Sequence, residues 1–109
     1  MKVDFDTIIA TKLSDRVSRK RVTGNKLEVI LYTYQAGAIF ARHQHEAEQL
    51  TIVLEGELVF VFDDEEVNLK TGEIILIPSL KPHGAYVPKG EGETKTYNIF
   101  TPVRKELPS

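Results

Sequence analysis

The sequence predicts an all-β fold, a small antiparallel barrel or sandwich. Short apolar stretches recur along the chain, and turn-forming residues separate them at close spacing. No stretch keeps the apolar periodicity of a long amphipathic helix. With 109 residues, of which 41% are hydrophobic, the chain is expected to form one domain over residues 1–109 and to bury a real core.

The order of the strands follows from the turn residues. A first segment around Ile8 and Ile9 gives no clear signal. Strands are then expected at residues 16–22, 27–34, 39–45, 49–54, 58–62, 67–69, 73–77, 83–87 and 93–100. The breaks between them are Gly24-Asn25, Gly37, Glu55-Gly56, the acidic cluster 63–66, Thr71-Gly72, Pro78, Pro82, Pro88, Gly90 and Gly92. Residues 103–109 are expected to be the loose end of the chain.

The balance of charge narrows the choice of partner. Lys and Arg number 14 and Asp and Glu 16, so the formal net charge is −2 and gives no bulk attraction to nucleic acid or to an anionic membrane. The basic run of Arg16, Arg19, Lys20 and Arg21 lies in a predicted strand, where its charges are divided between two faces. We therefore expect a small-molecule partner, and neither nucleic acid nor membrane.

Composition also indicates a compartment. The chain contains no cysteine, which excludes disulfides and cysteine-type zinc sites and fits a reducing environment. Residues 1–12 include Asp4 and Asp6 and lack a continuous apolar stretch, so no signal peptide is expected. No run approaches the roughly 18 apolar residues that a membrane span requires. We expect a cytoplasmic protein.

The three histidines of the chain fall into one pattern. His43 and His45 are two residues apart in a predicted strand, so both side chains point to one face, and the same parity reaches Gln49. His83 must come from another strand. Two histidines on a strand are usually solvated, but the regular spacing to flanking glycines favours a metal site. Neutral imidazole suits Zn, Fe, Ni, Cu or Mn, and this uncharged ligand set would leave the charge of the ion uncompensated.

At these positions the chain resembles the cupin superfamily. Its first motif, G(x)5HxH(x)3,4E(x)6G, is met at Gly37, His43, His45 and Gly56, with Gln49 in the place of the usual glutamate. The second, G(x)5PxG(x)2H(x)3N, is met at Gly72, Pro78 and His83, whereas Leu80 replaces the glycine and Val87 the asparagine. The resemblance covers about residues 27–100. It implies a double-stranded β-helix, or jelly-roll barrel, whose cavity binds a divalent metal ion (Fe, Mn, Ni or Zn) through His43, His45, Gln49 and His83.

A narrower resemblance concerns the C-terminal strand. The ligand set is similar to that of the small cupins of pectin and alginate breakdown that linearise 4,5-unsaturated uronates. Those proteins carry an Asp-x-Phe pair followed by an arginine, and the matching residues here are Asn98, Phe100 and Arg104. If the protein is an enzyme of this kind, Phe100 is expected to shape the cavity and Arg104 to orient a substrate carboxylate, although a solvated surface position is about as common for such an arginine. An amide cannot take up a proton as a carboxylate does, so the acid/base of that mechanism is missing at Asn98.

Three functions therefore remain open. The first is metal-dependent isomerase or lyase chemistry on a small anionic or carbohydrate-like molecule, such as uronate ring opening. The second is oxygen-dependent cleavage at an iron site, and the third is non-catalytic binding of a small molecule. Further candidates for proton transfer or substrate binding are Tyr32, Tyr34, Tyr86, Tyr97, Glu46, Glu48 and Arg42. For the tyrosines packing is the commoner role, and for the glutamates solvation.

One strand also predicts an oligomer. Leu50, Ile52 and Leu54 alternate with Thr51 and Val53, so both faces of this strand can be buried. One face would line the cavity, and the other is expected to meet a second sheet or a second subunit. Because a small domain gains stability by covering an exposed apolar sheet, we predict a homodimer.

Overall fold

The computed structural model describes residues 1–90 and 92–104, which form β-strands and one turn of 3-10 helix, η1 (Phe5–Thr7). The strands are β1 (Thr11–Ser14), β2 (Val17–Thr23), β3 (Glu28–Tyr34), β4 (Ile39–His43), β5 (Glu48–Glu55), β6 (Glu57–Val61), β7 (Glu66–Lys70), β8 (Ile74–Ile77), β9 (His83–Tyr86) and β10 (Thr94–Thr101). The predicted all-β fold is confirmed, and most predicted strands match to within two residues. The segment around Ile8, which gave no clear signal, leads from η1 into β1.

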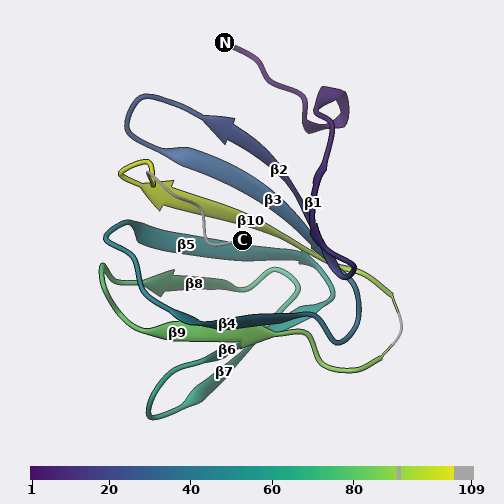
Figure 1. Cartoon of the computed structure of the whole chain (residues 1–109), viewed down its shortest axis with the longest axis vertical. Coiled ribbons are helices and arrows are strands. Elements are labelled where there is room, and N and C mark those ends of the chain that lie inside the picture. The colour runs from purple at the N-terminus through teal and green to yellow at the C-terminus, as the bar shows by residue number, and fades with distance from the viewer. Residues whose placement is uncertain (91, 105–109) are drawn as a thin grey trace.

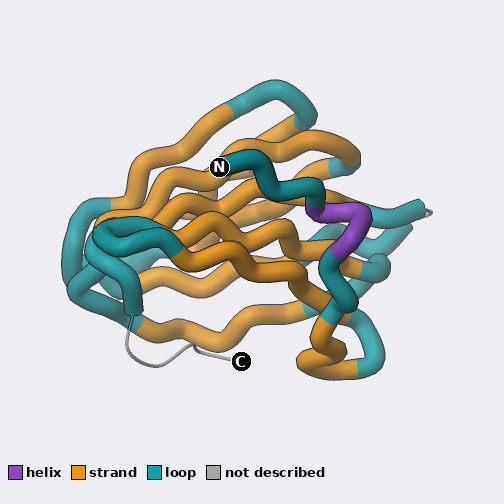
Figure 2. The backbone as a smooth tube through the Cα atoms, turned by 90° about the horizontal axis from the view of Figure 1, so that it is seen from above, coloured by secondary structure: helices purple, strands orange, loops and turns teal. Residues whose placement is uncertain are grey.

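The strands form two antiparallel sheets (Figure 1). The six-stranded sheet has the order β1-β2-β3-β10-β5-β8, and the four-stranded sheet has the order β4-β9-β6-β7. Chain neighbours such as β3 and β4 lie in different sheets, so the chain crosses repeatedly between the layers. Figure 2 shows the strands running side by side, with loops gathered at the ends of the sheets. This arrangement places the inner faces of the two sheets against each other.

Side chains alternate between the inside and the outside along the central strands. In β3, Glu28, Ile30, Tyr32 and Tyr34 are buried, whereas the residues between them are only partly buried. The same two-residue period runs through β5 and β10, as expected for strands with one face on a core. Tyr32 and Tyr34 each pack edge to face on Phe40 of the other sheet, with ring centroids 5.5 and 5.6 Å apart, and they stack on each other at 5.7 Å. The inner face of the larger sheet therefore supplies both the core and one wall of a cavity.

The turn between β8 and β9 explains one departure from the cupin motif. Lys81 N donates to Pro78 O at 3.2 Å, and Leu80 has a φ of 63° at the third position of this turn. A positive φ at that position favours glycine, which is the motif residue that Leu80 replaces. Leu80 N also donates to His45 O at 2.8 Å. The turn of the second motif thus holds the backbone of a histidine from the first.

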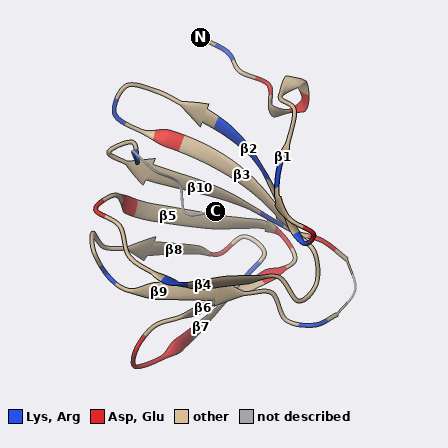
Figure 3. Cartoon of the chain, in the orientation of Figure 1, with Lys and Arg blue, Asp and Glu red and all other residues tan. Residues whose placement is uncertain are grey.

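The end of the chain differs from the sequence prediction at Arg104. Instead of being loose, Arg104 is buried, with 7% of its surface exposed, because its guanidinium pairs with buried Glu28. Residues 105–109 of the predicted loose tail lie outside the described residues. The basic run divides between faces as predicted, since Lys20 donates to Phe5 O whereas Arg21 pairs with Glu28. Figure 3 shows the basic positions of this run in blue along β2.

Candidate metal centre

The three histidines converge at one end of the space between the sheets. His43 ends β4 and is paired in register with His83, which begins β9. The potential ligand atoms of His43, His45 and His83 all lie within 4.8 Å of one another. His45 lies two residues beyond β4, so its position depends on the loop and on the bond from Leu80 rather than on strand parity. The geometry permits one ion to contact all three rings.

Backbone carbonyls orient each of these rings. Nδ1 of His43 lies 2.8 Å from Ala41 O, Nδ1 of His45 lies 2.7 Å from Ala47 O, and Nδ1 of His83 lies 2.8 Å from Lys81 O. A carbonyl oxygen can only accept, so each Nδ1 carries the proton and donates. In a neutral ring this leaves Nε2 with a free lone pair. Such contacts are the usual way in which proteins hold metal-binding imidazoles.

Whether the residues fit a cation is tested by what surrounds the Nε2 lone pairs of His45 and His83. Nε2 of His83 is buried and has no hydrogen-bond partner among the described residues. Nε2 of His45 lies 3.1 Å from Oε1 of Gln49. Burial lowers the pKa of His45, and it lowers the pKa of His83 to about 4, so both rings are neutral at pH 7. Acceptors facing one another without a proton fit a bound cation.

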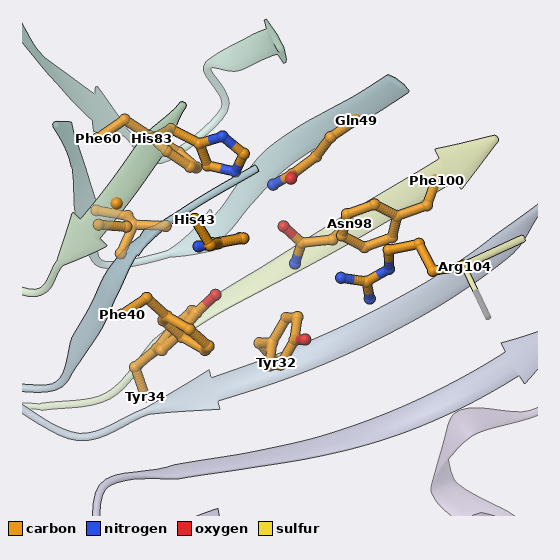
Figure 4. Close-up of a pocket in the computed structure, with 13 residues that line it drawn as sticks. Tyr32, Tyr34, Phe40, His43, Gln49, Phe60, His83, Asn98, Phe100 and Arg104 are labelled. Carbon is orange, nitrogen blue, oxygen red and sulfur yellow. The ribbon is translucent and has the colours of Figure 1, made fainter. Parts of the chain in front are cut away.

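A cavity of about 30 Å³ adjoins the histidines, which is room for about two water molecules. Figure 4 shows Gln49, Asn98, Phe100 and Arg104 around it, with the two tyrosines of β3 on the far side. The guanidinium carbon of Arg104 lies 3.5 Å from the ring centre of Phe100. Its Nε donates to Glu28, but its second terminal nitrogen, Nη2, is buried and has no partner among the described residues. The cavity therefore joins a potential cation site to an unpaired cationic donor.

Comparison with known proteins now identifies the family. The Cupin_2 family model, described as "Cupin domain", matches residues 30–100. This chain belongs to the cupin family. No curated protein matches the sequence.

Solved cupin structures share the fold at low sequence identity. An RmlC-like cupin from Shewanella frigidimarina NCIMB 400 has a TM-score of 0.84 and 21% identity, and the match covers 94% of this chain and 91% of that chain. KdgF from Halomonas sp. has a TM-score of 0.81 and 23% identity over 91% and 92% of the two chains. The polyketide cyclase RemF from Streptomyces resistomycificus has a TM-score of 0.84 and 19% identity over 97% and 82%. At these identities the likeness establishes the fold alone.

The cupin motifs identify the histidines and Gln49 from the sequence, but they do not include the buried charged residue Glu28. Glu28 is fully buried at the start of β3 and binds Arg21 through Oε2 and Arg104 through Oε1. Its signal was positional, because it shares strand parity with the inward-facing Ile30 and Tyr32. A charged residue on the apolar face of a strand needs a partner, and this one anchors the arginine of the cavity.

The other candidates from the sequence do not line this cavity, apart from the tyrosines Tyr32 and Tyr34. The hydroxyl of Tyr86 donates to Glu66 on the surface, and Tyr97 packs on Phe5 outside the sheet. Arg42 forms an exposed pair with Asp63. Glu46 and Glu48 are exposed. Within the described residues no helix has the length and apolar character that a membrane span would require.

Proposed function

We propose that this cupin binds a divalent metal ion through His43, His45, His83 and Gln49 and acts on a small anionic or carbohydrate-like molecule. Uronate ring opening or sugar isomerisation is the nearest chemistry. The observation that carries the proposal is the convergence of three imidazoles, each fixed by a backbone carbonyl, with the buried Nε2 of His83 lacking a donor among the described residues and Nε2 of His45 facing an amide oxygen. The choice of substrate class rests on the resemblance of this ligand set, with Phe100 and Arg104, to the uronate-linearising cupins.

Each residue has a defined task in this proposal. The ion, when bound, supplies Lewis acidity that polarises a carbonyl or hydroxyl oxygen of the substrate. Nη2 of Arg104 donates to a substrate carboxylate, while its bond to Glu28 keeps the guanidinium in place. Phe100 packs beneath the guanidinium and limits the width of the cavity. Since the cavity measures about 30 Å³, only the reacting end of a sugar-sized molecule enters it without movement of the walls.

A second candidate, non-catalytic binding, is favoured by the lack of an acid/base in the cavity. None of the residues that line it carries a carboxylate. Both terminal atoms of the Asn98 amide are engaged, Oδ1 with Thr51 and Nδ2 with Thr96. Burial raises the pKa of Tyr34 well above its ordinary value, so its hydroxyl stays protonated at pH 7. A cupin with this cavity can bind and polarise a ligand without having an evident group to move its proton.

The deciding experiment is a turnover screen of metal-loaded protein against unsaturated uronates, sugars and diketones, with oxygen recorded throughout. Conversion without oxygen uptake supports isomerase or lyase chemistry, whereas substrate-dependent oxygen uptake with Fe(II) supports the oxygenase alternative. Tight binding without turnover supports the binding function. Protein purified without chelators that contains no stoichiometric metal, together with a His43→Ala variant whose melting responds to metal as the wild type does, would exclude the metal site.

A single substitution tests the uronate chemistry. Asn98→Asp restores the carboxylate that the resemblance assigns as acid/base, and Thr51 can still donate to it. We expect this variant to create activity on unsaturated uronates or to raise it strongly. A metal-loaded Asn98→Asp protein with no gain in turnover would contradict the assignment of uronates as substrates.

We also propose that the cupin is a homodimer. The outer face of the six-stranded sheet carries Leu50 and Ile52 beside exposed Leu54, Ile74 and Leu76, and Ile74 and Leu76 are 56% and 63% exposed. Sheet register places these apolar side chains next to one another. Light scattering should give twice the mass of the chain, and Leu76→Glu should convert the dimer to monomer. A wild-type protein of single-chain mass at 100 µM would exclude a stable dimer.

A further inference from the structure

A chain of buried hydrogen bonds leads from Gln49 across the inner face of the six-stranded sheet. Nε2 of Gln49 donates to Thr51 Oγ1 at 2.9 Å, and this hydroxyl donates to Asn98 Oδ1 at 2.7 Å. Nδ2 of Asn98 donates to Thr96 Oγ1 at 2.7 Å, and Thr96 Oγ1 lies 3.3 Å from the hydroxyl of Tyr34. All five residues are buried, so their mutual bonds decide how each amide is oriented.

A backbone carbonyl at Thr96 favours one order of donors and acceptors along this series of hydrogen bonds. A hydroxyl both donates and accepts, so Thr51 and Thr96 can transmit either direction. The backbone carbonyl of Thr96 can only accept, and it lies 3.5 Å from Nδ2 of Asn98. At 3.5 Å this contact is a weak one, and it favours the orientation that places the amide nitrogen of Asn98 on the Thr96 side and Oδ1 toward Thr51. Thr51 must then donate to Asn98, which leaves its oxygen to accept from Nε2 of Gln49.

The direction matters because the amide of Gln49 can present either end to the histidines. With the chain as found, Oε1 faces Nε2 of His45, and both atoms offer lone pairs to a cation. In the reversed orientation, the NH2 group would donate to His45 and occupy the lone pair that the ion needs. It would also point a positive dipole at the ion. Binding of metal therefore requires one of two amide orientations of similar shape.

We propose that Thr51 and Asn98 are positioning residues that hold the amide of Gln49 with its oxygen toward the metal. This inference rests on the metal site proposed above and adds residues that are not themselves proposed ligands of the ion. A glutamate at position 49 would need no such help, since either carboxylate oxygen can face the ion. Because glutamine stands at position 49 where the motif has glutamate, the side chain must be held in one orientation, and the series of hydrogen bonds does this.

Thr51→Val tests the proposal, because valine keeps the shape of threonine and removes the hydroxyl. In the metal-bound variant Nε2 of Gln49 would be buried without an acceptor, since Gln49 is only 6% exposed. We expect the dissociation constant for Zn²⁺, measured by competition with a coloured chelator, to rise about ten-fold or more, the equivalent of one net hydrogen bond. Asn98→Leu, which frees Thr51 to reverse, should weaken Zn²⁺ binding in the same direction.

Two controls separate positioning from a general loss of stability. Thr94→Val removes another buried hydroxyl of β10. This hydroxyl bonds to the backbone of Glu57 and takes no part in the series of hydrogen bonds that reaches Gln49, so the variant should leave Zn²⁺ binding unchanged. In a Gln49→Glu background no NH2 group can be left without an acceptor. There Thr51→Val should change the Zn²⁺ constant by less than about two-fold, well below one hydrogen bond.

The outcomes are distinguishable. A ten-fold loss with Gln49 that disappears with Gln49→Glu supports positioning. An equal loss in both backgrounds, or no loss from Thr51→Val and Asn98→Leu in protein that melts cooperatively, overturns it while leaving the metal site intact. Wild-type protein that binds none of Zn²⁺, Ni²⁺, Mn²⁺ and Fe²⁺ overturns the proposed function and this inference together.

Discussion

Neutralising Glu28 should destabilise this cupin far more than neutralising a carboxylate on its surface. Glu28→Gln keeps the size of the side chain and removes its charge. The carboxylate is fully buried and contacts Arg104, whose side chain is 4% exposed, and Arg21, whose side chain is 34% exposed. After the substitution Arg21 can turn to water. Arg104 cannot, so a buried guanidinium loses its counter-charge.

The magnitude follows from that asymmetry. Removing one partner of a buried ion pair costs about 3–5 kcal/mol, and the partial exposure of Arg21 puts Glu28→Gln at the lower end, about 3 kcal/mol. For a chain of this size 1 kcal/mol shifts the melting temperature by about 4–8 °C, so the variant should melt about 15 °C lower. The wild-type arrangement survives because each carboxylate oxygen of Glu28 accepts from a different arginine.

The chain supplies a matched control in Asp63. Asp63→Asn makes the same chemical change in the pair with Arg42, whose two side chains are 66% and 63% exposed. Water replaces that pair, so the melting temperature should stay close to that of the wild type. Melting curves at pH 7 and low salt measure both variants. If Glu28→Gln and Asp63→Asn melt within about 3 °C of each other, the argument from burial is wrong.

Three further predictions concern strained turns and pH. Leu80→Gly should raise the free energy of unfolding by up to about 1 kcal/mol, because Leu80 has a φ of 63° and is 51% exposed; a lower melting temperature would contradict this. Gly56→Ala should lower the free energy of unfolding by about 2 kcal/mol or more, since its Cβ would meet Thr94 Oγ1 and lie 3.0 Å from Thr94 Cα. At Gly72 a Cβ meets nothing within 4 Å, so Gly72→Ala should lower it by about 1 kcal/mol. Equal losses of unfolding free energy in urea titrations would count against the clash at Gly56. For metal-free protein, the folded pKa of His83 is about 4 against an ordinary 6.5, so the unfolded chain binds a proton that the folded chain does not. Stability should be full above pH 6.5 and fall by about 3 kcal/mol toward pH 4, with a flatter slope for His83→Gln.

The sequence predicted most of the architecture because its information is local. Turn glycines and prolines mark strand ends, and alternation marks the inward face, so the strand from Thr94 to Thr101 was found to within a residue. The histidines were found because spacing along strands and turns sets their relative position. His45 shows the limit of that reasoning, since it lies beyond β4 and its backbone is held by a hydrogen bond from Leu80, which lies in a distant turn of the sequence.

What the sequence did not reveal depends on long-range pairing. Arg104 and Glu28 are 76 residues apart, so although strand parity points Glu28 inward, its pairing with Arg104 cannot be recognised without knowing how the ends of the chain are arranged around β3. Thr51 and Asn98 face each other only because β5 and β10 pair in this register. A threonine in a strand normally indicates β-propensity, so nothing local distinguishes one that orients an amide. The support of the site is a property of the fold, whereas its ligands are visible in the motif.

The charges around the cavity bear on what the cupin can bind. His43, His45, His83 and Gln49 are all uncharged as ligands, so a divalent ion would bring its full charge to a site with no carboxylate among the residues lining the cavity. Arg104 adds another positive charge, and Glu28, which offsets it, is already shared with Arg21. A low-dielectric cavity with this excess is stabilised by an anion and not by a neutral sugar alone. This charge balance is the reason why the ligand proposed above is anionic: with a divalent ion bound, an acidic sugar or another small carboxylate should bind more tightly than an uncharged isomer of the same size.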